Sequence, residues 1–124
     1  MDGTVPTELG SVPQLRELSI YGQRLSGTIP TELGLLTQAE GIFLHENFLD
    51  GTIPSELGLL TRLTSMWLHI LGLTGTVPSE LCDRLLNGTL KTLAIDCTKV
   101  ACDCGCSCPT EGGDAPTSGR FEEV

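Results

Sequence analysis

The 124-residue sequence has few aromatic side chains, few positive charges and no long apolar run. Aromatic residues are limited to 1 Trp, 1 Tyr and 3 Phe, whereas Leu occurs 21 times. So little aromatic volume is unusual for the core of a conventional enzyme, and a core built from one aliphatic residue indicates a packing position that recurs along the chain. The length is that of one domain.

Positive charge is scarce, with 7 Lys and Arg against 16 Asp and Glu and a net charge of −9. A nucleic-acid surface needs clustered cations, and we therefore expect no nucleic-acid partner. No stretch reaches the roughly 18 apolar residues of a membrane-spanning helix, so we expect no membrane segment in this chain. The residues after Met1 lack the basic and then apolar layout of a secretion signal. No strand or cap precedes Gly3, and an uncapped end would expose apolar edges, so we expect a fragment or a truncated gene model.

The sequence does contain an internal repeat. The octet Gly3-Thr-Val-Pro-Thr-Glu-Leu-Gly10 recurs with small changes from Gly27, Gly51 and Gly75, each time 24 residues further on. Between the octets, aliphatic residues recur at the same spacing, in the sets Leu15, Leu18, Ile20 and Leu25, then Ala39, Ile42, Leu44 and Leu49, then Leu63, Met66, Leu68 and Leu73. Constant spacing over four octets predicts an array of repeated structural units.

Each repeat predicts a single coil of chain. The alternation at Leu18 and Ile20, and at the equivalent later positions, is typical of a short strand with one buried face. The Gly and Pro of the octet predict a turn that ends the strand ladder. The Thr or Ser and the Glu that follow predict the start of a short helical turn, and Gly10, Gly34 and Gly58 would release the chain toward the next strand. A coil cannot bury its apolar edge alone, so the coils must stack.

This frame resembles the plant-type leucine-rich repeat, whose consensus is close to L-x-x-L-x-L-x-x-N-x-L-x-G-x-I-P, and the match covers residues 3–82. The resemblance implies an α/β solenoid, a right-handed coil with a parallel concave sheet and short helical turns. It also implies an extracellular or cell-surface location, as in receptor ectodomains and polygalacturonase inhibitors. The consensus Asn is kept only at Asn47, with Gln23 and Leu71 at the equivalent positions, and Ala39 and Gly41 predict weaker packing in the second coil.

In such a solenoid, the outward residues of neighbouring strands stack into columns about 4.8 Å apart. Two neighbouring columns on the concave face contain most of the aromatic and imidazole side chains. The first column is Ser19, Phe43 and Trp67, and the second is Tyr21, His45 and His69, with Glu46 beside them. Exposed aromatic residues are the usual anchors of an interface, so we predict that this face binds a protein, peptide or glycan.

Other readings of the same residues stay open. Cross-strand aromatic pairs also stabilise a sheet without any ligand, and the chain would then be a structural spacer of a receptor-like protein. His45 and His69 lack a fixed third ligand and a nearby nucleophile arrangement, so we expect no metal, no cofactor and no enzymatic activity. The hydroxyl column Thr4, Thr28, Thr52 and Thr76 is typical of turns, although a regular hydroxyl face could meet ice.

The period slips near the C-terminus, because Leu90, Leu93 and Ile95 lie 27 residues after Leu63, Met66 and Leu68. We expect a last strand there, reached through a three-residue insertion within Asp83–Gly88. The solenoid would then span residues 1–96, followed by a Cys-rich cap over 97–108 and a flexible tail over 109–124. Asn87-Gly88-Thr89 is a glycosylation sequon.

Six cysteines belong to this end of the chain, at Cys82, Cys97, Cys102, Cys104, Cys106 and Cys108. An even number that includes Cys82 and Cys97 favours disulfides that seal the last coil, in any of 15 connectivities. The alternating run from Cys102 to Cys108 is also similar to metallothionein-like thiolate clusters, which bind zinc or copper(I) in reducing surroundings.

Overall fold

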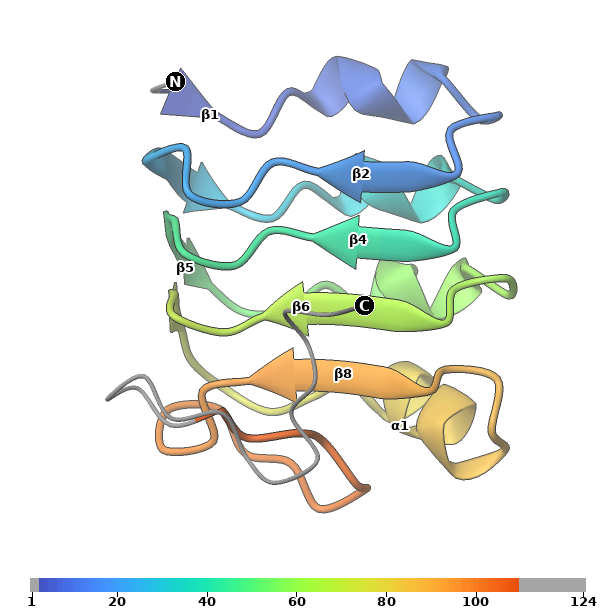
Figure 1. Ribbon diagram of the computed structural model, residues 1–124, viewed down its shortest axis with the longest axis vertical. Helices are drawn as coiled ribbons and strands as arrows, with labels where there is room; N and C mark the ends of the chain where they lie inside the picture. Colours follow the sequence, from blue (N-terminus) through green and yellow to red (C-terminus); the bar gives the residue numbers. More distant parts are fainter. Residues whose placement is uncertain (1–2, 110–124) are drawn as a thin grey trace.

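The computed structural model describes residues 3–109, which form stacked coils with two parallel sheets and a row of helical turns (Figure 1). The first sheet has the strand order β2-β4-β6-β8, with strands at Glu17–Ser19, Gly41–Phe43, Ser65–Leu68 and Thr92–Ile95. Its outer face is called the concave face below. The helical turns are η1, η2 and η3, which are 3-10 helices at Thr7–Ser11, Thr31–Leu35 and Ser55–Leu59, and the α-helix α1 at Ser79–Leu86. The predicted leucine-rich repeat solenoid is therefore confirmed.

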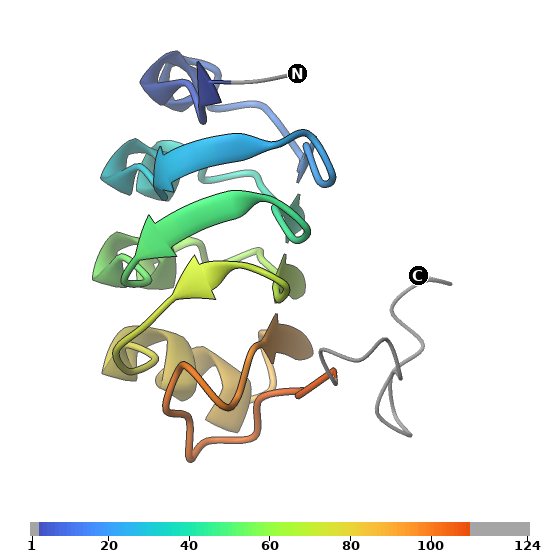
Figure 2. The same cartoon turned by 90° about the vertical axis from the view of Figure 1, so that its left-hand side faces the viewer.

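A second parallel sheet, which the sequence analysis did not predict, has the order β1-β3-β5-β7. Figure 2 shows its strands across the front of the molecule, with the coils lying one below another. Its strands are Gly3–Thr4, Leu25–Thr28, Phe48–Gly51 and Gly72–Leu73. The first Gly of each octet has positive φ, as at Gly51 with φ 82°. At Gly51 the backbone passes close to the methyl group of Thr28 in the preceding coil. A Cβ on Gly51 would lie 3.1 Å from Thr28 Cγ2, so the Gly also permits a close approach between coils.

The register of the first sheet follows the repeat. Ile42 pairs with Leu18 and with Met66, at the 24-residue period, and Met66 pairs with Leu93, at the predicted 27-residue step. The longer step coincides with the helical segment, which has five residues in η1, η2 and η3 and eight in α1. The extra residues therefore lengthen the helical turn and leave the last strand in register.

The core is a set of aliphatic columns that run through the stack. Equivalent inward positions are each at most 2% exposed, as in the sets Leu25, Leu49 and Leu73, then Leu33, Leu57 and Leu81, then Leu44, Leu68 and Ile95. Burial of one such side chain contributes about 2 kcal/mol, and most of that burial is between coils and not within one coil. This is why the fold needs several coils.

The helical turns stack more closely than the sequence suggested. We expected Gly10, Gly34 and Gly58 to release the chain, but a Cβ on Gly34 would lie 2.7 Å from Glu56 O in the next turn. These positions are Gly because backbone meets backbone there. The predicted caps are also absent from the described turns: each begins after a Pro, and no hydroxyl side chain makes a cap hydrogen bond.

Buried polar side chains join successive coils at the end of the concave strands. Asn47 Oδ1 accepts the backbone N–H groups of Gln23 and Leu25 at 2.9 and 3.0 Å, and its Nδ2 donates to Ile20 O at 2.9 Å. In the last coil, Asp96 takes the equivalent role, since its carboxylate accepts the N–H groups of Ile70 and Leu71. The sequence analysis counted only Asn47 and so missed this second link.

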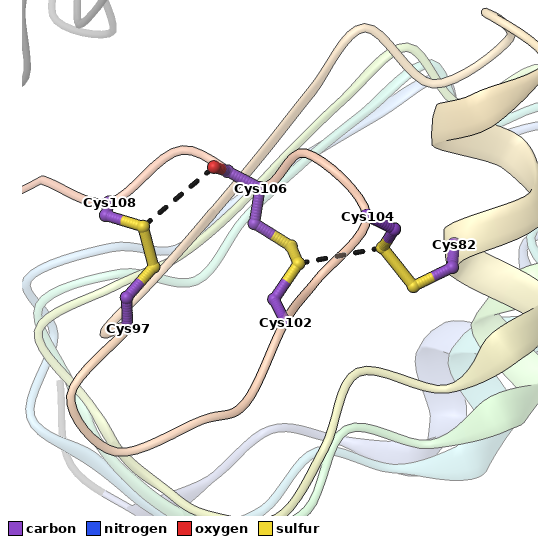
Figure 3. Close-up of a disulfide and its surroundings, with 6 residues drawn as sticks. All are labelled: Cys82, Cys97, Cys102, Cys104, Cys106 and Cys108. Carbon is purple, nitrogen blue, oxygen red and sulfur yellow. Dashed lines mark hydrogen bonds between the residues drawn. A yellow bond between two sulfur atoms is a disulfide. The ribbon is translucent and has the colours of Figure 1, made fainter.

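The cap closes the last coil. Its disulfides are Cys82–Cys104, Cys97–Cys108 and Cys102–Cys106 (Figure 3). Ala101 exchanges backbone hydrogen bonds with Gly75 and Val77, and Ser107 does so with Leu93 and Ile95. The segment thus pairs with the free edges of both sheets, which would otherwise expose unpaired backbone groups. Residues 110–124 of the predicted tail lie outside the described part of the chain. Between residues 3 and 109, no helix has the length and hydropathy of a membrane span.

Candidate functional site

The predicted binding residues come together on the concave face as two adjacent columns. Strand pairing aligns Ser19 with Phe43, Phe43 with Trp67 and Trp67 with Ala94. The next outward position carries Tyr21, His45 and His69, just beyond the ends of the strands as defined by their hydrogen bonds. Residues one repeat apart therefore become side-chain neighbours, as the period requires.

The second column is a continuous stack of rings. The centroids of Tyr21 and His45 lie 4.7 Å apart at 12°, and those of His45 and His69 lie 4.7 Å apart at 15°. The first column meets it edge-on through Trp67, whose ring lies 5.1 Å from that of His45, and within the first column the rings of Phe43 and Trp67 also meet edge-on at 4.9 Å. Five rings on three successive coils thus form one connected cluster, called the ring cluster below, which holds their orientations fixed.

The ring cluster is far less exposed than we expected. Tyr21 is 50% exposed, but Trp67 is 8%, His69 7% and His45 6% exposed. The idea of an exposed Trp anchor on an open sheet is therefore wrong, because side chains spaced by one strand pack against one another. The accessible part of the site is formed by Ser19, Tyr21 and Glu46, with Phe43 half-buried at its edge.

Both imidazoles are held in the neutral form. Burial lowers the pKa of His69 to about 4, with the neighbouring His45 acting in the same direction and the Asp96 carboxylate opposing. Burial likewise lowers the pKa of His45, against the opposing charge of Glu46. Within the described part of the chain, His45 Nδ1 has no hydrogen-bond partner. At neutral pH the two imidazoles therefore add no charge to the ring cluster.

Charge lies along the border of the ring cluster. Arg16 and Glu40 form an exposed ion pair with an N–O distance of 3.8 Å, and Glu17 and Glu46 are also exposed, Glu46 at the opposite end of β4 from Glu40. The ring of Phe43 lies over Gly41, where a Cβ would be 2.8 Å from the ring. Gly41, read from the sequence as weak packing, instead makes room for this aromatic side chain.

The other predicted site residues lie away from the concave face, and one residue of that face was not predicted. The six cysteines are in the cap, and Asn87 is exposed just after α1, where its Oδ1 accepts a hydrogen bond from Thr89 Oγ1 at 2.6 Å. Glycosylation at Asn87 stays a prediction. Asp96 continues the column of His69, and the signal for it was the 27-residue step between the last two coils.

Comparisons with solved structures show what these coils are similar to. The Arabidopsis receptor kinase HAESA, in complex with the peptide hormone IDA and the co-receptor SERK1, is 35% identical with a TM-score of 0.66 over 75% of this chain and 16% of that chain. In the BIR3–SERK2 complex from Arabidopsis thaliana, the matched chain is 30% identical with a TM-score of 0.66, over 86% of this chain and 54% of that one. The chain is a leucine-rich repeat protein of the plant type. A plant ice-binding protein is also similar, 27% identical with a TM-score of 0.66, over 77% of this chain and 29% of its own.

This leucine-rich repeat protein spans less than two thirds of each of those three chains. No family model matches the sequence, and no curated protein matches it in sequence. Other similar structures are the ectodomain of the plant membrane receptor kinase GASSHO1/SCHENGEN3 and the BIR2 ectodomain, both from Arabidopsis thaliana. They confirm the predicted extracellular or cell-surface location, with which three disulfides agree, because disulfides persist in oxidising compartments.

Proposed function

We propose that this leucine-rich repeat protein is a non-enzymatic recognition module that binds a peptide or a protein segment on its concave face. The observation that carries the proposal is the ring cluster, in which buried rings fix the position of a half-exposed Tyr21. A preorganised aromatic side chain loses little entropy on binding, which is the usual property of an interface anchor. Receptors with the same coils are recorded with peptide or protein partners, which supports the same class of ligand.

The charge around the site favours a cationic segment. Glu17, Glu40 and Glu46 outnumber Arg16 on the accessible border, and the whole chain carries a net charge of −9. Such a field attracts Lys and Arg over long range, and a guanidinium can also stack on the exposed face of Tyr21. The ligand is therefore a segment with basic residues next to an apolar or aromatic one.

The experiment is a selection of displayed random peptides on the folded, oxidised protein, followed by affinity measurements on variants. Tyr21→Ala should weaken the selected peptides by at least about tenfold, as expected for an interface anchor. Phe48→Ala is the matched control, because Phe48 is also aromatic, is 65% exposed and lies on the second sheet. Trp67→Ala is a poor test, since removal of a buried Trp costs about 3–5 kcal/mol of folding stability.

Two results would contradict the proposal. One is a selection that yields no peptide, which would leave the role of a structural spacer without a ligand. The other is a set of peptides whose affinity falls equally in Tyr21→Ala and Phe48→Ala, which would place binding elsewhere. A glycan array with the same two variants tests the remaining class of ligand.

Ice binding is a second candidate, favoured by one observation. The column Thr4, Thr28, Thr52 and Thr76 is exposed along the second sheet, each separated by one repeat, and a plant ice-binding protein has similar coils. The exposed Phe48 and Asp50 interrupt the same face, which weighs against a flat ice-binding surface. A thermal hysteresis measurement decides this candidate, with Thr52→Lys as the variant that should abolish the effect.

A further inference from the structure

The sulfur atoms of two disulfides lie next to each other in the cap. Cys82–Cys104 and Cys102–Cys106 are neighbouring bridges, and Cys102 Sγ lies 3.6 Å from Cys104 Sγ (Figure 3). The Sγ atoms of Cys102, Cys104 and Cys106 all lie within 4.8 Å of one another. The bridge Cys97–Cys108 is not part of this sulfur group.

The spacing between the bridges is close to that of a tetrahedral thiolate site. Zinc binds thiolates at about 2.3 Å, so the edges of a tetrahedron of four sulfurs are about 3.8 Å long. The distance between Cys102 and Cys104 already has this value within a few tenths of an ångström. Cys82 Sγ is bonded to Cys104 Sγ and does not belong to the group of three, so after reduction the bonded pairs would have to separate and Cys82 Sγ would have to turn toward Cys102 and Cys106.

We propose that reduction of these two disulfides creates a four-thiolate site for zinc, held by Cys82 from α1 and by Cys102, Cys104 and Cys106 from the cap. In the reduction, each bridge takes two electrons and two protons from a dithiol, which becomes a disulfide, and gives two Cys thiols. Zinc then displaces four protons from the four thiols and binds four thiolates. No further oxidant or reductant is needed.

The backbone around the sulfur group is held by contacts that reduction does not break. Ala101, next to Cys102, exchanges hydrogen bonds with Gly75 and Val77, and Ser107, next to Cys106, does so with Leu93 and Ile95. The opposite side of the site is the helix α1, whose Leu81 is fully buried in the core. Three of the four ligands thus stay near the fourth when the bridges open, which lowers the entropy cost of metal binding.

The site would keep the cap closed where disulfides are not stable. In oxidising surroundings two covalent bridges tie the cap to itself and to α1, and in reducing surroundings one zinc ion would tie the same four residues. The end of the solenoid would then be sealed in either state. This role is separate from the concave face, so neither result on peptide binding bears on it.

The test uses the full chain reduced with a phosphine under argon, then mixed with zinc or cobalt and freed of excess metal by gel filtration. We expect one zinc per chain in the reduced protein and none in the oxidised one. Cobalt should give the strong visible absorption of a tetrahedral thiolate site. Circular dichroism, recorded before and after metal addition, shows whether the reduced chain is folded or folds on binding.

Two paired variants locate the site. Cys102→Ser with Cys106→Ser removes two ligands and leaves no odd thiol in that bridge, and it should weaken zinc binding more than about 100-fold, since loss of even an outer-shell partner costs 10–100-fold. Cys97→Ser with Cys108→Ser removes the distant bridge and should retain one zinc per chain. The proposal fails if reduced wild-type protein binds no zinc, or if the two paired variants lose zinc equally.

Discussion

The carboxylate of Asp96 accepts the backbone N–H of Leu71 at 2.9 Å, although the two residues are 25 positions apart. It also accepts the N–H of Ile70 at 2.8 Å. Asp96 is 2% exposed and its bond to Leu71 is buried, so the Leu71 N–H would lose its acceptor in a place that water reaches poorly if the carboxylate were removed. The last coil is therefore tied to its neighbour by a side chain that stands outside the consensus position of the repeat.

The first prediction concerns this link. Asp96→Ala leaves the buried N–H of Leu71 and the part-buried N–H of Ile70 without an acceptor and should lower the free energy of unfolding by about 2–3 kcal/mol. Asp96→Asn should cost less, because a single amide oxygen can accept two such donors, as Asn47 Oδ1 does. Denaturant unfolding of both variants checks this, and equal losses would show that the carbonyl-type acceptor is not what matters.

The second prediction concerns backbone strain at Ile70, which is β-branched and has φ 57°. A left-handed conformation costs an ordinary residue roughly 1–2 kcal/mol, whereas Gly adopts it freely at the cost of some additional chain entropy. Ile70→Gly should therefore stabilise the protein by about 0.5–1 kcal/mol, despite the loss of a side chain that is 42% exposed. The control is Ile70→Ala, which keeps the strain and should not stabilise the protein.

The third prediction concerns the contact between helical turns. Gly34→Ala places a Cβ 2.7 Å from Glu56 O and 2.9 Å from Glu56 Cβ, so η2 and η3 must move apart. Overpacking of this kind costs about 1–3 kcal/mol, measured as a lower midpoint of denaturant unfolding. The neighbouring Leu35 is 56% exposed, and Leu35→Ala should change stability by no more than about 0.5 kcal/mol. A Gly34→Ala variant as stable as Leu35→Ala would contradict the close stacking.

The fourth prediction concerns acid. The pKa of His69 is about 4 in the folded protein, below the 6.5 of an unperturbed His. Between these values the unfolded chain binds more protons than the folded one, so stability falls as the pH drops from 6.5 to 4 and changes no further from this cause below that.

His69→Gln removes the titrating group and keeps a planar polar side chain. The difference in unfolding free energy between wild type and this variant should change with pH only in that window, by at most about 1.4 kcal/mol per pH unit. Thermal or denaturant unfolding at several pH values gives this difference. A difference that does not depend on pH between 6.5 and 4 would show that His69 is not buried in the neutral form.

Much of the fold could be predicted because one period fixes all coils at once. Leu18, Ile42 and Met66 lie in register in the first sheet, and the shifted Leu93 continues it. The second sheet could not be predicted, because its strands have two to four residues and include the glycines that also signal a turn. Disulfide pairing could not be chosen either, since five closely spaced cysteines allow many partners in sequence.

The position of the site was predicted from the sequence, but the burial of its side chains was not. The repeat correctly aligned Tyr21, His45 and His69, because register alone decides which residues are neighbours. The burial of two of these rings depends on how they pack on one another and on Trp67, and an alignment of repeat positions does not show this packing. The link by Asp96 was missed because this residue follows the three-residue insertion and so lies beyond the 24-residue repeats that were compared.

The constant register between the middle coils makes the length of this array adjustable. Every inner coil offers its neighbours the same aliphatic columns and the same Thr methyl over the same Gly, so a duplicated block of 24 residues inserted between Gly51 and Gly75 would find matching partners above and below. Each added block would widen the concave sheet by about 4.8 Å while α1 and its cysteines still terminate the stack. Lengthening or shortening the concave face thus requires no redesign of either end.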